Sequence, residues 1–167
     1  MDINVLCKDL LKELYKFSND VITFGEPIND DRLENFEKSI GFSLPTDFKN
    51  ILKKHNGISI LGKEILGYDK QFQSSSLEQV YQFEHFEVAN KMPPEYVPFS
   101  PDGRGNHYCL DLSRCDSDIS PIVFWQWDFQ YDNTNEIETC NYSFIEWVKE
   151  VMIEWTLEDY NYDGSEK

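Results

Sequence analysis

Two short apolar runs, residues 107–112 and 122–127, stand out in the pattern of hydrophobic and polar positions. The first run alternates between apolar and more polar side chains, which predicts a half-buried strand. The second is aromatic or β-branched at nearly every position, which is typical of an inner strand and indicates the centre of the core. Turn-forming residues precede the first run, and a loop over residues 113–121 joins the two. We therefore predict an antiparallel pair of strands.

Apolar residues at spacings of three and four predict amphipathic helices in three segments of the first half of the chain. These helices are expected over residues 4–17, from residue 28 or 29 to residue 40, and over residues 45–55. Asn29 is placed to cap the second helix and Gly41 to end it, whereas Pro45 suits the first position of the third. Residues 20–27 are expected to form a short extended linker.

The second half of the chain is predicted to mix short strands with two helices. Ser75 and Glu78 have the spacing of a capping box at the start of a short helix over residues 76–86. Ser143 is expected to begin the last helix, whose apolar stripe ends at Trp155. The remaining expectations are a strand or hairpin over 58–67, strands over 96–99 and 137–140, a polar loop over 128–136, and a polar tail over 158–167 that frays.

The composition is that of a globular protein with one domain, since the chain has 167 residues of which 40 % are hydrophobic and 28 % are charged. No apolar run approaches the roughly twenty residues that a membrane span needs. Acidic residues and lysines interrupt the N-terminal apolar pattern, so we expect no signal peptide. The four cysteines are then interpreted as reduced thiols of a cytoplasmic protein: Cys7, Cys109, Cys115 and Cys140.

The formal net charge of -16, from 15 basic and 31 acidic residues, restricts the class of partner. It argues against direct nucleic-acid binding, because the chain shows no basic stripe that could follow a phosphate backbone. The same charge would accelerate association with a basic protein, by about 10-fold to 1000-fold at low salt. The alternative interpretation is that the charge serves solubility alone.

Several short motifs, weak singly, occur in an order and spacing that resembles the SUKH superfamily. They are Phe36, Glu37 and Gly41; Leu44-Pro45-x-Asp47-Phe48; Asn56-Gly57; Asp102-Gly103-x-Gly105; Tyr108-Cys109-Leu110-Asp111; Pro121-Ile122-Val123-Phe124-Trp125; and Ser143-Phe144-x-x-Trp147. The family includes the fungal Smi/Knr cell-wall regulators and bacterial immunity proteins that neutralise a cognate polymorphic toxin, often a nuclease. The resemblance implies an α+β fold, with a mainly antiparallel β-sheet flanked by helices, and no catalytic machinery or cofactor.

The resemblance also suggests how the chain is organised. We expect a single SUKH-like domain over residues 1–167. Within it, residues 1–27 form an N-terminal helix and linker, residues 28–157 form the family core, and residues 158–167 form an acidic tail.

His107, Cys109 and Asp111 share one face of the first predicted strand, which invites comparison with a Cys-His-Asp nucleophile. Residues two apart on a strand are about 6.5 to 7 Å apart at the backbone, whereas a nucleophile and its base need about 3 Å between reacting atoms. We therefore expect Asp111 to close a turn or cap a neighbour, and Cys109 to pack as a small apolar residue.

No metal site is predicted. His107, Cys109 and Cys115 lack the paired spacing of a zinc knuckle. Residues 159–164 reproduce the first half of a calcium loop, but position twelve would fall beyond residue 167. Residues 102–105 lack the Lys-Ser/Thr ending of a phosphate loop, and we interpret them as a tight turn.

We expect the partner to be a basic toxin protein bound by the acidic surface and, if it is exposed, by Trp127, since Trp is a common hot-spot residue. Trp125 and Trp127 point the same way on their strand, and we expect both to lie in the core. The alternative is that one of them is partly exposed beside Asp128 and Asp132, where it would be a hot spot rimmed by acids. The candidate contacts are Asp102, Asp111, Asp116, Asp118, Trp127, Asp128 and Asp132. Two other classes stay open: a regulatory scaffold of the Smi/Knr type, and a hydrolase that uses acids such as Asp111 and Asp128.

Overall fold

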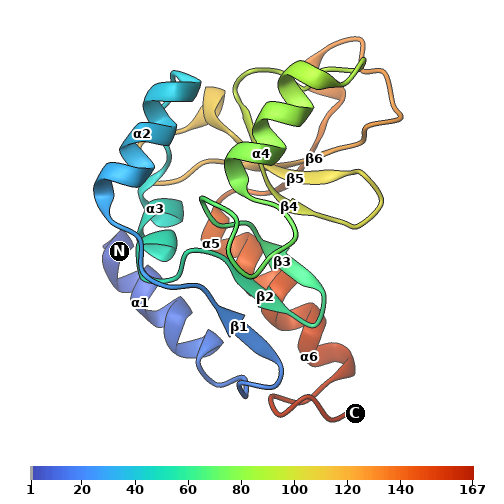
Figure 1. The fold of residues 1–167 in the computed structure, drawn as a ribbon. Coiled ribbons are helices and arrows are strands. Elements are labelled where there is room, and N and C mark those ends of the chain that lie inside the picture. Colours follow the sequence, from blue (N-terminus) through green and yellow to red (C-terminus); the bar gives the residue numbers. More distant parts are fainter. Residues whose placement is uncertain (1) are drawn as a thin grey trace.

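The computed structural model describes residues 2–167 and has the predicted α+β class (Figure 1). Its main helices are α1 (Ile3–Leu14), α2 (Asp30–Ile40), α3 (Thr46–Lys54), α4 (Leu77–Gln82), α5 (Phe144–Trp147) and α6 (Trp155–Asp159). Two π-helical segments continue α4 and α5: η1 (Phe83–Glu87) and η4 (Val148–Glu154). Strands β1 (Ile22–Phe24), β2 (Ile58–Ile60) and β3 (Lys63–Ile65) form one sheet. Strands β4 (Tyr96–Pro101), β5 (His107–Asp111), β6 (Ile122–Trp125) and β7 (Glu138–Asn141) form another.

Local sequence signals set the ends of the N-terminal helices. The side chain of Asn29 accepts a hydrogen bond from the N–H of Arg32 at 3.1 Å, and Gly41 ends α2 with a φ of 79°. Both features were predicted. Pro45 was predicted to be the first residue of the third helix. In the structure it is the N-cap, and α3 begins one residue later, at Thr46. The cap of α4 is likewise shifted by one, because Ser76 and not Ser75 accepts the N–H of Gln79.

The first sheet contains one strand that the sequence analysis missed. Strand β1 lies within residues 20–27, which were expected to form a linker. It pairs antiparallel with β2, with Ile22 opposite Ile60. Of the two alternatives predicted for residues 58–67, a strand or a hairpin, the structure has the β2–β3 hairpin. Its turn at Leu61 and Gly62 uses φ angles of 45° and 87°. A strand of three residues has too little pattern to be separated from an extended loop, so its pairing is decided by tertiary contacts.

The second sheet contains the predicted antiparallel pair, with Tyr108 opposite Phe124 and Cys109 opposite Val123. Both strands are covered on both faces, so the prediction that β5 is half-buried is wrong. One face packs into the main core, and the other into a smaller cluster that includes Cys109 and Met92. Met92 comes from the segment between η1 and β4, and Ile137, just before β7, packs in the same cluster.

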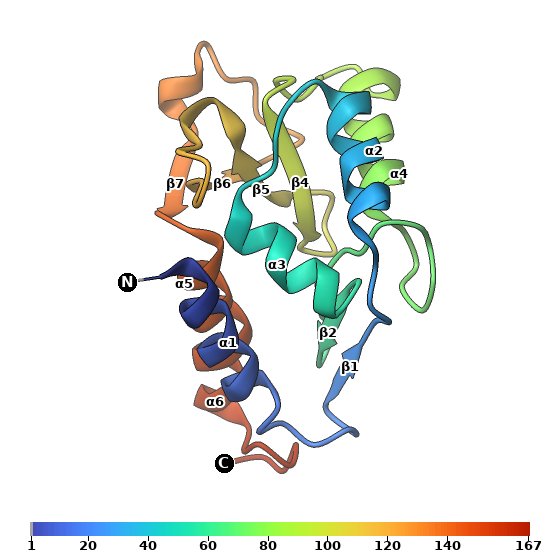
Figure 2. The ribbon, with the colours of Figure 1, turned by 90° about the vertical axis from the view of Figure 1, so that its left-hand side faces the viewer.

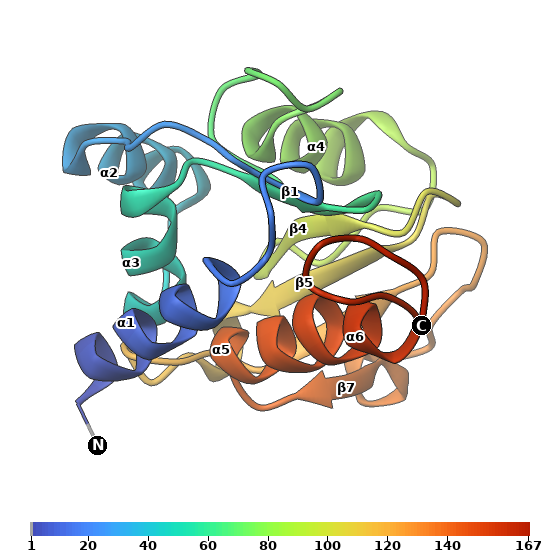
Figure 3. The ribbon, with the colours of Figure 1, turned by 90° about the horizontal axis from the view of Figure 1, so that it is seen from below.

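Helices pack against the strands from more than one side. Figure 3 shows α4 beyond the β4 edge and the continuous α5–α6 rod between β5 and β7 in this view, with α1 beside the rod. Figure 2 shows α3 running between α1 and the strands. The core holds a group of aromatic rings that pack edge to face. The ring centroids of Phe48 and Phe144 are 4.9 Å apart, and those of Phe99 and Trp147 are 4.8 Å apart. The two sheets meet beside this group, where the N–H of Leu66 donates to the carbonyl oxygen of Phe99 at 2.8 Å.

The C-terminal segment begins as predicted and ends differently. Ser143 caps α5 by accepting the N–H of Glu146 at 3.1 Å. Trp155, however, is 41 % exposed and does not complete the apolar stripe. The tail that was expected to fray folds into a turn against the N-terminal segment, where Ser18 N–H donates to the carbonyl oxygen of Tyr162 at 2.9 Å. No helix formed by residues 2–167 is long and apolar enough to cross a membrane.

Candidate functional site

A groove lies between η1 and the turn that leads into β5, and we call it the Trp127 groove. It consists of two adjoining cavities of ≈ 410 Å³ and ≈ 480 Å³ that share Phe83, Glu84 and Gly105. Val88, Ala89, Asn90 and Trp127 complete one end, and Ser75, Gln79, Val80, Glu87 and His107 complete the other. Its walls are mostly apolar, and its charged side chains come from η1.

Trp127 forms the far wall of the groove and is 54 % exposed. The alternation of β6 ends at Trp125, which is buried, so the prediction that the two tryptophans share a core face is wrong. The indole Nε1–H of Trp127 donates to the carbonyl oxygen of Arg104 at 3.0 Å, and Asn90 donates to the carbonyl oxygen of Trp127 at 3.0 Å. The first bond orients the exposed indole ring, and the second holds the backbone of Trp127.

The turn at residues 102–106 is built to receive this ring. Gly105 has a φ of 90°, and a Cβ at this position would lie 2.7 Å from Cδ1 of Trp127. Only glycine allows both the conformation and the close contact. Asp102 accepts the N–H of Arg104 at 2.7 Å and that of Asn106 at 3.1 Å. Partial burial opposes ionisation of Asp102, but the hydrogen bonds from Asn106 and Arg104 outweigh it and lower its pKa.

The floor of the groove is a buried pair that the sequence analysis missed. Nε2 of His107 lies 2.9 Å from Oε1 of Glu84, and the two side chains are 7 % and 5 % exposed. Oε2 of Glu84 and Nδ1 of His107 are buried without a hydrogen-bond partner in the described part of the chain. The sequence analysis weighed His107 only as a member of a catalytic triad or of a zinc site, and no sequence signal links it to Glu84, which lies 23 positions earlier.

The wall opposite Trp127 is the π-helical segment η1. Its wider turn leaves the rings of Phe83 and Phe86 exposed, while it buries Glu84. His85 links η1 to the segment before β4 through hydrogen bonds. Its two ring nitrogens lie 2.8 Å from the carbonyl oxygen of Tyr81 and 3.0 Å from that of Pro93. Single π-helical turns within α-helices occur frequently at functional sites.

The face that carries His107, Cys109 and Asp111 does not form a catalytic triad. His107 contacts Glu84, while the thiol of Cys109 lies 3.8 Å from Sδ of Met92. Burial, together with the charge of Glu84, raises the pKa of Cys109 well above its ordinary value. Cys109 therefore packs as a small apolar residue, as predicted.

Asp111 differs from the other candidate contacts in its burial. It is buried, and its carboxylate accepts the N–H of Ser113 at 3.1 Å and pairs with Nε of Arg114 at 2.7 Å. Its expected role as a cap is therefore confirmed, while its role as a partner contact stays a prediction that its burial disfavours. A carboxylate whose oxygens are used within the fold has little capacity left for a partner.

The other acidic candidates are exposed but lie on three different loops. Asp102 and Asp128 adjoin the Trp127 groove through the turn at 102–106 and through Trp127. Asp132 lies further along the loop between β6 and β7, where its N–H donates to Glu136 at 2.8 Å. Asp116 and Asp118 belong to the loop that packs on the start of α3, where the N–H of Asp47 donates to the carbonyl oxygen of Asp118 at 3.1 Å.

No three His, Cys, Asp or Glu side chains within residues 2–167 form a cluster that could hold a metal ion. In the segment that resembles half a calcium loop, Oδ1 of Asp163 accepts the N–H of Ser165 at 2.9 Å. Asp163 thus closes the terminal turn.

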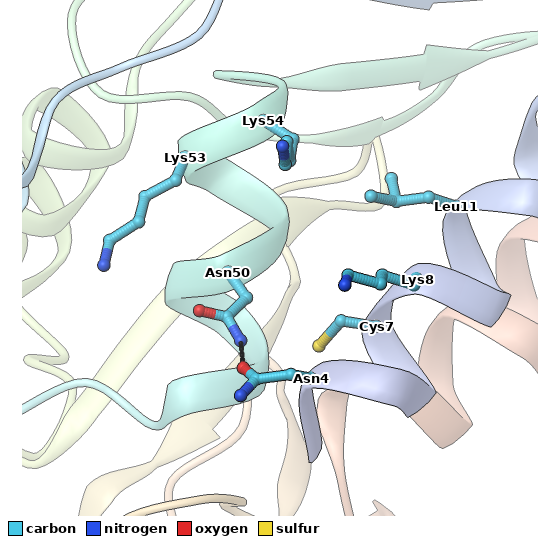
Figure 4. A pocket seen from close by; sticks show the side chains of 7 residues that line it. All are labelled: Asn4, Cys7, Lys8, Leu11, Asn50, Lys53 and Lys54. Atoms are coloured by element: carbon cyan, nitrogen blue, oxygen red, sulfur yellow. Dashed lines mark hydrogen bonds between the residues drawn. The ribbon is translucent and has the colours of Figure 1, made fainter. Parts of the chain in front are cut away.

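A second cavity, of ≈ 310 Å³, lies between α1 and α3 and has a different chemistry (Figure 4). Lys8 and Lys54 stand at its edge, while Lys53 projects away and pairs with Asp30 at 2.7 Å. Asn50 donates to Asn4 at 2.7 Å. Burial, reinforced by nearby Asp47, raises the pKa of the Cys7 thiol to about 11, so it is a poor nucleophile. Because the side-chain amides of Asn4 and Asn50 bond to each other, this cavity is the weaker candidate for a binding site.

The fold and the groove define a class: an α+β protein with antiparallel sheets and an exposed aromatic groove beside a Gly-rich turn. The family model of the SMI1 / KNR4 family (SUKH-1) matches residues 27–150, and the chain belongs to this family. It is 24 % identical over 178 residues to the SPbeta prophage-derived uncharacterized protein YokK of Bacillus subtilis (strain 168), covering 92 % of this chain and 90 % of YokK. A crystal structure of a protein from Pseudomonas syringae pv. tomato shares the fold, with a TM-score of 0.62 and 17 % identity. The match covers 88 % of this chain and 98 % of that one.

Proposed function

We propose that this protein is a non-enzymatic immunity protein of the cytoplasm, which binds a cognate basic toxin, such as a nuclease domain, and occludes its active surface. The observation that carries the proposal is Trp127, a half-exposed ring held rigidly over an apolar groove on a protein with a net charge of -16. Membership of the SUKH family supports a protein partner in a toxin system.

The groove has the composition of an interface hot spot. Interface energy concentrates in Trp, Tyr and Arg residues that are fixed before binding and shielded by a polar rim. Trp127 is fixed by its bonds to Arg104 and Asn90, and Phe83 offers a second exposed ring across the groove. Exposed carboxylates nearby would attract a basic partner and set its approach.

The chemistry of the buried groups favours binding over catalysis. The thiol of Cys109 is buried and has a raised pKa, and Asp111 is occupied by Arg114. A hydrolase would need a nucleophile or general base within reach of a substrate. Steric and electrostatic occlusion requires only a complementary surface.

A pull-down with the purified protein from an extract of its own host, at low and then moderate salt, would test the proposal. We expect recovery of a basic toxin domain at one-to-one stoichiometry. W127A should then weaken binding by about 30-fold, the effect of a hot-spot residue worth about 2 kcal/mol. W155A is the matched control, because Trp155 is 41 % exposed and lies on α6.

Equal affinities of W127A and wild type for the captured toxin would show that the groove is not the interface. If purified protein captures a cellular regulator and no toxin, the regulatory scaffold of the Smi/Knr type replaces the immunity role. Calorimetry with the purified partner distinguishes these outcomes, because it gives both stoichiometry and affinity.

A further inference from the structure

The floor of the Trp127 groove has two buried polar atoms whose hydrogen-bonding capacity is unused. In the described part of the chain, Oε2 of Glu84 and Nδ1 of His107 have no partner, although the opposite atoms of the two side chains bond at 2.9 Å. Buried polar atoms are nearly always paired in folded proteins, and an orphaned one is destabilising. A ligand that supplied a donor to Glu84 would relieve this deficit.

The surroundings of Glu84 indicate which donor fits. A carboxylate oxygen forms its strongest hydrogen bonds with cationic donors. The walls beside it are the aromatic rings of Phe83 and Trp127, and Glu87 lies at the rim one turn along η1. A guanidinium is planar, stacks on aromatic rings and is more weakly hydrated than an ammonium, so arginine suits this groove better than lysine.

We propose that the Trp127 groove binds an arginine side chain of the protein partner, with the guanidinium bonded to Glu84 and stacked against Trp127. The identity of the partner rests on the proposed function, but the site itself does not. The charge of -16 and the acidic rim would draw such a side chain in. Entry requires the ring of Phe83 or the side chain of Glu84 to turn, since Oε2 is covered in the unbound form.

The test uses N-acetyl-arginine amide as a probe, with N-acetyl-citrulline amide as its neutral isostere and N-acetyl-lysine amide as a second cation. The resonances to follow by NMR are the indole N–H of Trp127 and the backbone N–H groups of Glu84 and Gly105. We expect saturable shifts at these positions with arginine, weaker binding of lysine, and none of these shifts with citrulline.

Variants decide whether Glu84 is the acceptor. E84Q should weaken arginine binding by about 10-fold, because one charge-assisted bond is lost. E34Q is the control of equal charge, since Glu34 is exposed on α2. Should E84Q not fold, the comparison of arginine with citrulline on the wild type still tests the site. Shifts spread evenly over the surface, or equal for the three probes, would overturn the proposal.

Two further outcomes separate this inference from the proposed function. A toxin that binds through Trp127 while arginine produces no local shift would refute the arginine site alone. Arginine binding without any captured toxin would leave the site and remove the immunity role.

Groove shifts that appear on dilution without any probe would assign the groove to a second copy of this chain and also refute the proposal.

Discussion

Asp47 at the start of α3 accepts the backbone N–H of Ile145 in the first turn of α5, at 3.3 Å. The same carboxylate accepts the N–H of Phe48 at 2.7 Å, and the side chain is fully buried. One acidic residue thus joins the N-termini of two helices that are 98 positions apart in the chain. Desolvation dominates over these hydrogen bonds and raises the pKa of Asp47 to about 7.

Asp47 should make stability decrease as pH rises. Its folded-state pKa of about 7 exceeds the ordinary value of 3.8, so the folded state binds more protons between these values and loses its advantage as pH increases. Between pH 5 and pH 7 the free energy of unfolding should fall by about 2 kcal/mol from this group. Urea unfolding of wild type and D47N measures the difference. We expect D47N to gain relative stability over this range, and a difference independent of pH would contradict the prediction.

G105A should destabilise the fold and disturb the Trp127 groove. Gly105 has a positive φ, and its Cβ would clash with the ring of Trp127. We expect a loss of about 2–3 kcal/mol in the free energy of unfolding, together with a shifted indole resonance. G103A is the matched control, because its φ is 83° but no atom lies within 4 Å of the added Cβ. It should lose about 1 kcal/mol from strain alone. Equal losses in the two variants would show that the contact with Trp127 costs nothing.

Reversal of Asp128 and Asp132 to lysine should slow association with the basic partner. We expect about a tenfold lower on-rate at low salt and a weaker dependence on salt, with little change in the off-rate. The double reversal of Glu154 and Glu158, both exposed near the C-terminal end, changes the net charge equally. Stopped-flow measurements compare the two. Equally slow association of the two double variants would mean that only net charge matters. An unchanged on-rate in the Asp128 and Asp132 variant would contradict electrostatic steering by these residues.

The four thiols should react with a thiol reagent in two groups. Cys115 and Cys140 are partly exposed, whereas Cys7 and Cys109 are buried, and none of the four forms a disulfide within residues 2–167. Burial raises the pKa of Cys115, and it raises that of Cys140 to about 11, so even this pair should react slowly at pH 8. Cys7 and Cys109 should react only on unfolding. Rapid modification of all four in the native protein, followed by mass spectrometry, would contradict this burial pattern.

The sequence determined the elements whose signals are local. The caps at Asn29 and Ser143 and the Gly41 helix end depend on side chains within a few positions of the backbone they bond, so residue types alone identify them. The β5–β6 pair was predictable for the same reason, because its apolar runs flank a short loop. The acidic composition is likewise a property of the sequence alone, and the proposal of a basic partner starts from it.

Tertiary structure alone decided the site. Glu84 and His107 carry no mutual signal in the chain, and they meet because the fold brings η1 beside the first residue of β5. The separation of Trp125 from Trp127 depends on where β6 stops pairing, which is set by its neighbours in the sheet and not by alternation. Asp111 had the residue type of a surface contact but is used inside the fold by Arg114. Sequence patterns report which face of an element is apolar, whereas the groups that come together from distant elements depend on packing, which local patterns do not encode.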